Sequence, residues 1–190
     1  MANNKSVLEQ LRSGLLKEHF EAVKFGPYRF IGKAVYARSG KSDKIFYGLF
    51  NLCGEWVFST LDGMEEYATE EVHNTAFYQW SRYDNKEQLL GYVIGRFMKP
   101  DTPVPENMDY YDIPEILVGK AFVAGEDKNE GHACNFGRSA RQELYNPSSS
   151  FPLSAEIFPA RDRKFNLING FGTNVVGFYE AVELKTPPQE

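Results

Sequence analysis

The chain has 190 residues, of which 42% are hydrophobic and 25% are charged, a composition typical of a globular protein with one sizeable core. Its net charge of −5, without a basic stripe, argues against nucleic acid as a partner. No apolar run is long enough for a signal peptide or a membrane span, so we expect a cytoplasmic protein. The two cysteines and three histidines lack the spacing of metal ligands or of a redox pair, and we expect no metal and no other cofactor.

An N-terminal helix is predicted over residues 6–20. Leu8, Leu11 and Leu15 recur at the spacing of one helix face, and the other face is charged. This helix would lie on the outside of the domain or dock a second subunit, so a homodimer stays open. We assign residues 1–24 to it.

The rest of the first half is predicted to form a strand, a helix, an acidic loop and a hairpin of two strands, over residues 28–37, 43–56, 61–74, 75–83 and 89–98 respectively. Aromatic and β-branched side chains favour the first strand, and Ser42 or Asp43 is a good N-cap for the helix. The acidic segment, which we call the acidic loop, is expected to be a loop or a short helix whose charges face solvent. Three prolines between residues 100 and 105 then separate this half from the next.

The second half repeats the order strand, helix, strand, strand, over residues 110–124, 131–145, 151–159 and 174–184. The segment from Ile31 to Ala37 resembles that from Val118 to Ala124, and Gly95 has an echo in Gly177 at a similar offset. We therefore predict an α+β fold of duplicated β-α-β-β units with pseudo-twofold symmetry, and antiparallel sheets around a central ligand groove. A single domain would span 25–185, with halves 25–100 and 108–185 and a flexible tail at 186–190.

Glu156 is the residue that most needs an explanation. It lies in a short apolar strand between Pro152 and Pro159, and burying a carboxylate there is costly unless something pairs with it. An edge strand with Glu156 in water is one interpretation, and we favour the other, a carboxylate in the central groove. The candidate ligand-binding residues are Glu156, Trp80, Tyr78, Phe158, Tyr92, Tyr110 and Phe30. A place in the core is the alternative for the aromatic residues.

Three segments carry a family resemblance: Phe30-Ile31-Gly32-Lys33, Ile113-Pro114 with Leu117-Val118-Gly119, and the strand from Phe151 to Phe158. Over roughly residues 25–183 the chain resembles the GyrI-like small-molecule-binding family, which includes effector-binding domains of AraC-type and MerR-type multidrug regulators. That family's strand reads Pro, about two residues, then Phe-Glu-x-Tyr, with the glutamate in the pocket. Glu156 matches the glutamate, whereas Ala155 and Phe158 replace the two aromatic residues. With no helix-turn-helix in the sequence, the resemblance implies a standalone binding module.

The favoured function is binding or sequestration of small hydrophobic or cationic organic molecules, because a carboxylate among aromatic rings suits a lipophilic cation. A hydrolase that uses Glu156 to activate water is the first alternative. We favour a non-enzyme and assign no catalytic residue, since Phe158 lacks the hydroxyl of the family tyrosine. The second alternative is a protein-binding inhibitor whose acidic surface meets a basic partner, through Glu65, Glu66, Glu70 and Glu71.

Overall fold

The structure is a computed structural model that describes residues 6–38, 54–71, 75–81, 89–151, 153–159 and 174–186. Its helices are α1 (Val7–Arg12), α3 (Glu55–Asp62), the 3-10 turn η2 (Glu65–Tyr67) and α4 (Glu130–Arg141). Its strands are β1 (Glu18–Phe25), β2 (Tyr28–Arg38), β3 (Thr75–Ser81), β4 (Leu89–Met98), β5 (Asp109–Ile113), β6 (Ile116–Ala124), β7 (Tyr145–Pro147), β8 (Ser154–Phe158) and β9 (Val175–Leu184).

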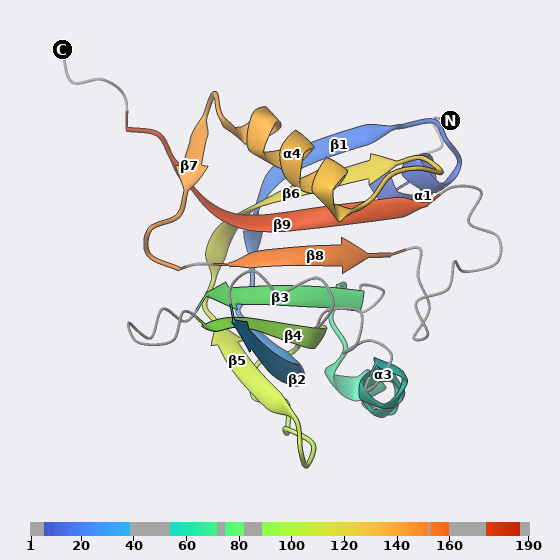
Figure 1. Ribbon diagram of the computed structural model, residues 1–190, viewed down its shortest axis with the longest axis vertical. Helices are drawn as coiled ribbons and strands as arrows, with labels where there is room; N and C mark the ends of the chain where they lie inside the picture. The colour runs from blue at the N-terminus through green and yellow to red at the C-terminus, as the bar shows by residue number, and fades with distance from the viewer. Residues whose placement is uncertain are drawn as a thin grey trace.

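The strands form one antiparallel sheet whose order reflects a duplication. Eight of them are hydrogen-bonded in the order β1-β6-β9-β8-β3-β4-β2-β5, and β7 pairs with β9 (Figure 1). The unit β2-α3-β3-β4 contributes the strand order β2-β4-β3, and the unit β6-α4-β8-β9 contributes β6-β9-β8. The two units meet where β3 pairs with β8. Counted outward from this pair, the order is β3, β4, β2 on one side and β8, β9, β6 on the other. The predicted duplicated β-α-β-β fold is therefore confirmed, and the strand that carries Glu156 lies at its centre.

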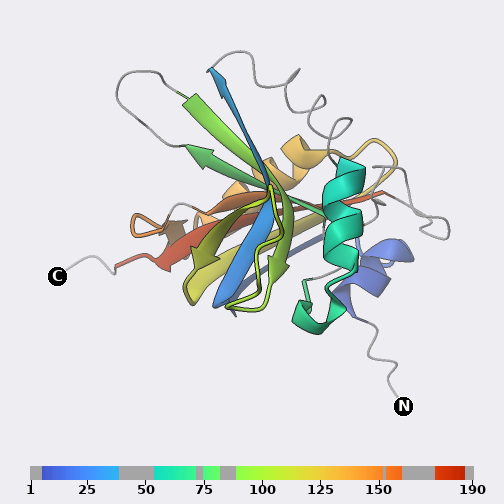
Figure 2. The same cartoon turned by 90° about the horizontal axis from the view of Figure 1, so that it is seen from below.

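The sheet is strongly curled. β1 and β2 hold the first and seventh places in the order, which a flat sheet would separate by about 29 Å at about 4.8 Å per strand. Phe25 ends β1 and Tyr28 begins β2, so three peptide units of at most about 11 Å must join them. The sheet closes this gap by curling into a half-barrel, and the strands change direction strongly from one edge to the other (Figure 2).

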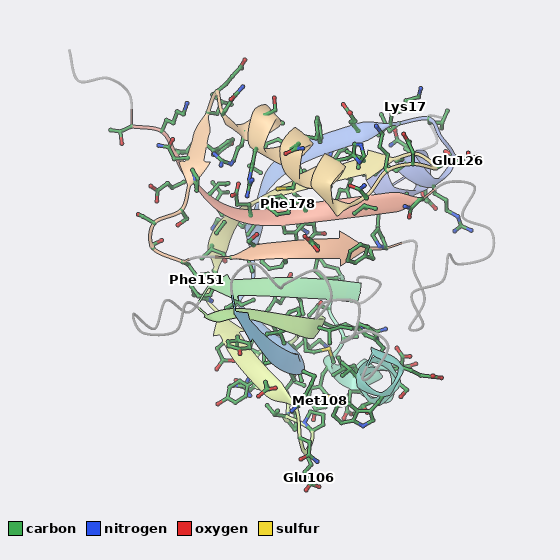
Figure 3. All side chains as sticks on the ribbon, viewed as in Figure 1. Lys17, Glu106, Met108, Glu126, Phe151 and Phe178 are labelled. Carbon is green, nitrogen blue, oxygen red and sulfur yellow. The ribbon has the colours of Figure 1, made fainter. Side chains whose placement is uncertain are left out.

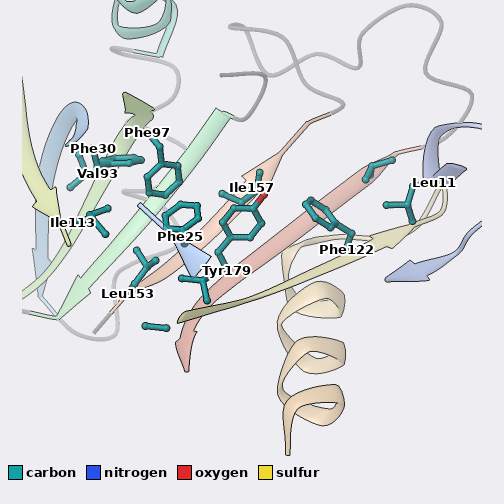
Figure 4. Close-up of a cluster of buried hydrophobic side chains, with 14 of the residues drawn as sticks. Leu11, Phe25, Phe30, Val93, Phe97, Ile113, Phe122, Leu153, Ile157 and Tyr179 are labelled. Carbon is teal, nitrogen blue, oxygen red and sulfur yellow. The ribbon is translucent and has the colours of Figure 1, made fainter. Parts of the chain in front are cut away.

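Side chains alternate between two faces of this sheet. On the inner face lies a cluster that we call the inner cluster, which includes Leu11, Phe25, Phe30, Val93, Phe97, Val118, Phe122, Leu153, Ala155, Ile157 and Tyr179 (Figure 4). The ring centroids of Phe25 and Phe97 are 5.0 Å apart although four strands separate β1 from β4, which shows how far the curl brings the two halves together.

The opposite face, which we call the helix face, carries both long helices. Its cluster includes Val57, Phe58 and Leu61 of α3, Ala133 of α4, and Ile31, Ile94, Phe158, Val176 and Phe178 of the sheet. α4 packs on β6 and β9, and α3 packs on β4. Both helices thus cover the same face, as expected for a duplication.

The predicted helix over residues 6–20 was wrong in its second half. α1 ends at Arg12, Gly14 takes a left-handed φ of 74°, and residues from Glu18 onward form the edge strand β1 against β6. Leu11 is buried, whereas Leu15, the next member of the predicted stripe, is 66% exposed. The glycine ends the helix because it adopts the left-handed conformation without a steric penalty.

Two further boundaries differ from the prediction. The predicted strand over 110–124 is two strands, β5 and β6, with Pro114 between them, because proline lacks the N–H that a central strand donates. The predicted helix over 131–145 ends at Arg141, and β7 follows. Most of the predicted helix over 43–56 lies outside the described residues. The predicted hairpin is confirmed as β3 and β4.

Candidate functional site

Glu156 lies on β8, in the middle of the sheet, on the helix face. Its neighbours in the strand, Ala155 and Ile157, belong to the inner cluster, and Phe158 belongs to the helix-face cluster. The side chains of this strand therefore alternate between the two faces of the sheet. In the ladders, Glu156 stands opposite Phe178 of β9.

The carboxylate of Glu156 is partly buried, close to α4. Its Oε2 atom is buried, and the carboxylate interacts electrostatically with the Cys134 thiol on α4. Burial raises the pKa of that thiol and Arg138 opposes the shift. The carboxylate of Glu156 is among the charges that raise this pKa further. Because its Oε2 atom is buried, the carboxylate of Glu156 is only partly exposed to the water that screens charge.

Phe178 is the aromatic residue that pairs with Glu156 across the β8–β9 ladder. It is buried and lies on β9 where α4 crosses the strand (Figure 3). The guanidinium carbon of Arg138 lies 5.8 Å from its ring centroid, within the range of a cation–π contact. The ring opposite Glu156 therefore already accepts a cation on its face. Sequence reasoning missed Phe178, although the echo between Gly95 and Gly177 marks its strand as the equivalent of β4.

The structure distributes the other predicted ligand-binding residues over both faces. Phe158 is buried on the helix face, the face of Glu156. Phe30 is buried in the inner cluster with its ring centroid 4.8 Å from that of Phe97. Tyr110 lies on the edge strand β5, 50% exposed, with the guanidinium carbon of Arg29 4.6 Å from its ring centroid. Phe30 and Tyr110 therefore do not lie beside Glu156.

Tyr78, Trp80 and Tyr92 are placed here by backbone register alone. Tyr78 pairs with Ala155, and Phe77 is the β3 position that pairs with Glu156. Trp80 and Tyr92 pair with Gly91 and Gln79 respectively. Their contact with a ligand stays a prediction, and Phe77 joins the positions to be tested.

The structure also contains a buried charged cluster on the inner face, which we call the Glu71 cluster: Glu71, Lys120 and Tyr179. Glu71 is only 4% exposed. The Tyr179 hydroxyl donates to its Oε2 atom at 2.9 Å, and the Lys120 ammonium donates to its Oε1 atom. The prediction that all charges of the acidic loop face solvent was wrong for Glu71, because Lys120 on β6 offers a buried carboxylate a partner.

A cavity of about 430 Å³ adjoins the Glu71 cluster. Its walls are formed by α1, β1 and the residues after η2, with Lys120, Phe122 and Tyr179 of the sheet as its floor. It opens on the inner side of the sheet, so it is separate from the Glu156 carboxylate on the helix face. No sequence pattern indicates this cavity, because α1, β1 and β6 are brought together only by the folding of the chain.

Within the described part of the chain, no group of three or more histidine, cysteine, aspartate or glutamate side chains is arranged to hold a metal ion. None of the helices in that part has both the length and the hydrophobicity needed to cross a membrane.

Comparison with known proteins relates the chain to solved structures. No family model matches it, and neither does any curated protein. SAV2435 bound to tetraphenylphosphonium has a TM-score of 0.58 at 8% identity, over 87% of this chain and 94% of that one. EcmrR in its DNA complex has a TM-score of 0.55 at 9% identity, over 93% of this chain but 62% of that one.

A proposed transcription regulation protein of Staphylococcus aureus has a TM-score of 0.54 at 8% identity, over 87% of this chain and 98% of that one. This chain therefore covers less than two thirds of EcmrR and nearly all of the other two proteins. At such identities the likeness concerns the fold alone. The chain has the curled, antiparallel α+β fold of these three proteins.

Proposed function

We propose that this chain is a binding module of the GyrI-like kind for small hydrophobic or cationic organic molecules, with Glu156 as the charge that anchors the ligand. The observation that carries the proposal is the position of Glu156. It is a partly buried carboxylate on the central strand, opposite the buried ring of Phe178 and on the face that carries α3 and α4.

The chemistry of this position favours a lipophilic cation. A carboxylate in weakly screened surroundings attracts a positive charge more strongly than one in water does. Each aromatic ring in contact adds about 0.5–2 kcal/mol of cation–π attraction. Burial of the ligand's apolar surface contributes roughly 25 cal/mol per Å². The contact of Arg138 with Phe178 is an intramolecular example of the same attraction.

The comparisons add support of two kinds. SAV2435 was solved with tetraphenylphosphonium, a lipophilic cation, and EcmrR was solved on DNA. By analogy of fold, we propose a lipophilic cation as ligand and a regulatory role for the binding event.

A pair of ions with the same shape and opposite charge tests the proposal. Tetraphenylphosphonium and tetraphenylborate are titrated into the wild-type chain and into Glu156→Gln by isothermal calorimetry. We expect the cation to bind the wild type more tightly, and Glu156→Gln to weaken its binding at least tenfold, about 1.4 kcal/mol. Removal of the negative charge should leave borate binding unchanged or stronger.

The control is Glu18→Gln, which removes the same charge from an exposed position of the edge strand β1. It should leave both affinities unchanged. Equal affinity of the Glu156→Gln variant and the wild type for the cation would contradict the proposed anchor. Mass spectrometry of the recovered ligand should show it intact, and a cleaved product would support the hydrolase instead.

A further inference from the structure

The cavity beside the Glu71 cluster lies on the inner face, and the proposed function does not use it. Its apolar lining comes from three elements: Val7 and Leu8 of α1, Val23 of β1, and Phe122 of β6. Apolar walls around a volume of about 430 Å³ are the usual features of a small-molecule site.

The charges that line this cavity are unequal in number. Three carboxylates, Glu21, Glu70 and Glu71, face two ammonium groups, Lys24 and Lys120. Both ammonium groups are engaged with carboxylates. Lys120 pairs with Glu71 within the floor, and Lys24, 82% exposed, lies 3.2 Å from Glu115, which is outside the lining.

The remaining two carboxylates, Glu21 and Glu70, lie at the edge of the cavity, where they contact groups that are not fixed cations. Glu21 Oε2 is 3.7 Å from His19 Nε2, and Glu70 accepts from the Tyr28 hydroxyl at 3.5 Å. Burial raises the pKa of Tyr28 to about 12, with the charges of Glu70 and Glu71 as further causes. The three carboxylates and two ammonium groups of the lining sum to a net negative charge, which favours a cation and disfavours an anion.

We propose that this cavity is a second small-molecule site, which takes a protonated amine with an apolar body. The ammonium group would bind between the carboxylates of Glu21 and Glu70, which accept its N–H donors. The apolar body would lie against Val23 and Phe122, over the Glu71 cluster. An amine fits better than a quaternary cation because both edge carboxylates can accept hydrogen bonds that a quaternary centre cannot donate.

The test uses three probes that share one ring system and differ in charge: 1-naphthylmethylammonium, 1-naphthylmethanol and 1-naphthylacetate. Each is titrated into the full chain, with binding followed by amide chemical shifts. We expect the ammonium probe to bind most tightly and to shift amides of β1 and β6 around Val23 and Lys120. The double variant Glu21→Gln/Glu70→Gln should weaken its binding at least tenfold.

Two control variants separate this site from its surroundings and from the helix face. Glu18→Gln/Glu65→Gln removes the same number of charges from exposed positions that do not line the cavity, and it should bind the ammonium probe like the wild type. Glu156→Gln should also bind the ammonium probe like the wild type. Equal affinity for all three probes, no binding of the ammonium probe, or loss of its binding in Glu156→Gln would each overturn the proposal.

Discussion

Glu71 and Lys120 hold the loop after η2 against the sheet. Both side chains are almost entirely buried, at 5% and 12% exposure, and the ammonium of Lys120 also lies 5.2 Å and 4.9 Å from the ring centroids of Phe25 and Tyr179. Burial of such a pair removes both charges from water, so its net contribution to stability is small. Loss of one partner is a different case, since it leaves the other charge buried.

Lys120→Met should therefore destabilise the fold by about 3–5 kcal/mol, because Glu71 would stay buried without its cation. The free energy of unfolding in urea measures this. The double variant Lys120→Met/Glu71→Leu replaces the pair by apolar side chains and should regain most of the loss. Equal stability of the wild type and Lys120→Met would contradict the burial of a charged pair.

A second ion pair gives a prediction for pH. Arg29 donates to both carboxylate oxygens of Asp112, at 2.7 Å and 3.0 Å, and this bonding lowers the pKa of Asp112. A lowered pKa in the folded state contributes stability that is present above the unfolded value, about 3.9, and is lost as pH falls through the folded value. Asp112 is 61% exposed, so solvent screening keeps this contribution small.

Carboxyl carbon shifts of Asp112, followed by NMR from pH 7 to pH 2, check this prediction. The wild type should titrate below the ordinary aspartate range. Arg29→Met should move the midpoint upward, since it removes the hydrogen bonds that favour the carboxylate. The same midpoint in both proteins would show that the pair is not formed in solution.

At the scale of elements, β2 and β4 approach each other more closely than side chains allow. Gly32 pairs with Gly95, and a Cβ atom added at either would lie about 2 Å from a backbone carbonyl oxygen of the other strand, 1.9 Å and 2.0 Å respectively. Neither strand can move away from the added Cβ atom without disturbing the hydrogen bonds of the β2–β4 ladder. This explains why glycine stands at both positions.

Gly95→Ala should consequently destabilise the protein by about 1–3 kcal/mol or more, as overpacking does. Thermal unfolding measures the effect. Gly63→Ala is the matched control, because a Cβ there meets nothing closer than 3.4 Å, and its Tm should change little. A Gly95→Ala variant as stable as Gly63→Ala would contradict the close approach of the two strands.

Periodicity in the sequence predicted most of the strands and one hairpin, but not the register in which strands distant in sequence pair. The β3–β4 hairpin and the β8 strand follow from alternating side chains and turn residues, so local chemistry was sufficient. Register depends on which residues meet across the ladder, and a slip by one residue exchanges the faces. The sequence names Tyr78 as a candidate ligand-binding residue together with Glu156, but only the ladder shows that Phe77 pairs with Glu156 and Tyr78 with Ala155.

The charged residues show the same limit: contacts between residues far apart in the sequence could not be predicted. Glu156 was singled out as a candidate from the sequence because a carboxylate stands out in an apolar strand. Glu71 was not, because its neighbours are acidic and its partner Lys120 lies 49 positions away. The cavity beside it depends on the curl of the sheet, and no local pattern encodes that curl.

At the scale of the whole molecule, the two halves share one sheet and one inner cluster. Phe25, Phe30 and Phe97 come from β1, β2 and β4, and they pack with Ile157 and Tyr179 of the second half. The halves join through the β3–β8 ladder. Neither half can bury its inner face without the other.

We therefore expect the two halves to unfold together. Urea unfolding followed by far-UV circular dichroism and by tryptophan fluorescence should give coincident transitions. Two separated transitions would show that the halves are independent units, against the shared inner cluster.

The central claim is that a lipophilic cation binds on the helix face beside Glu156. A crystal of the complex with tetraphenylarsonium tests it most directly, because the anomalous signal of arsenic locates the cation. We predict a peak on the helix face with Glu156 as the nearest carboxylate, and its loss in Glu156→Gln crystals. A peak only in the inner-face cavity, nearest Glu21 or Glu70, would contradict the claim.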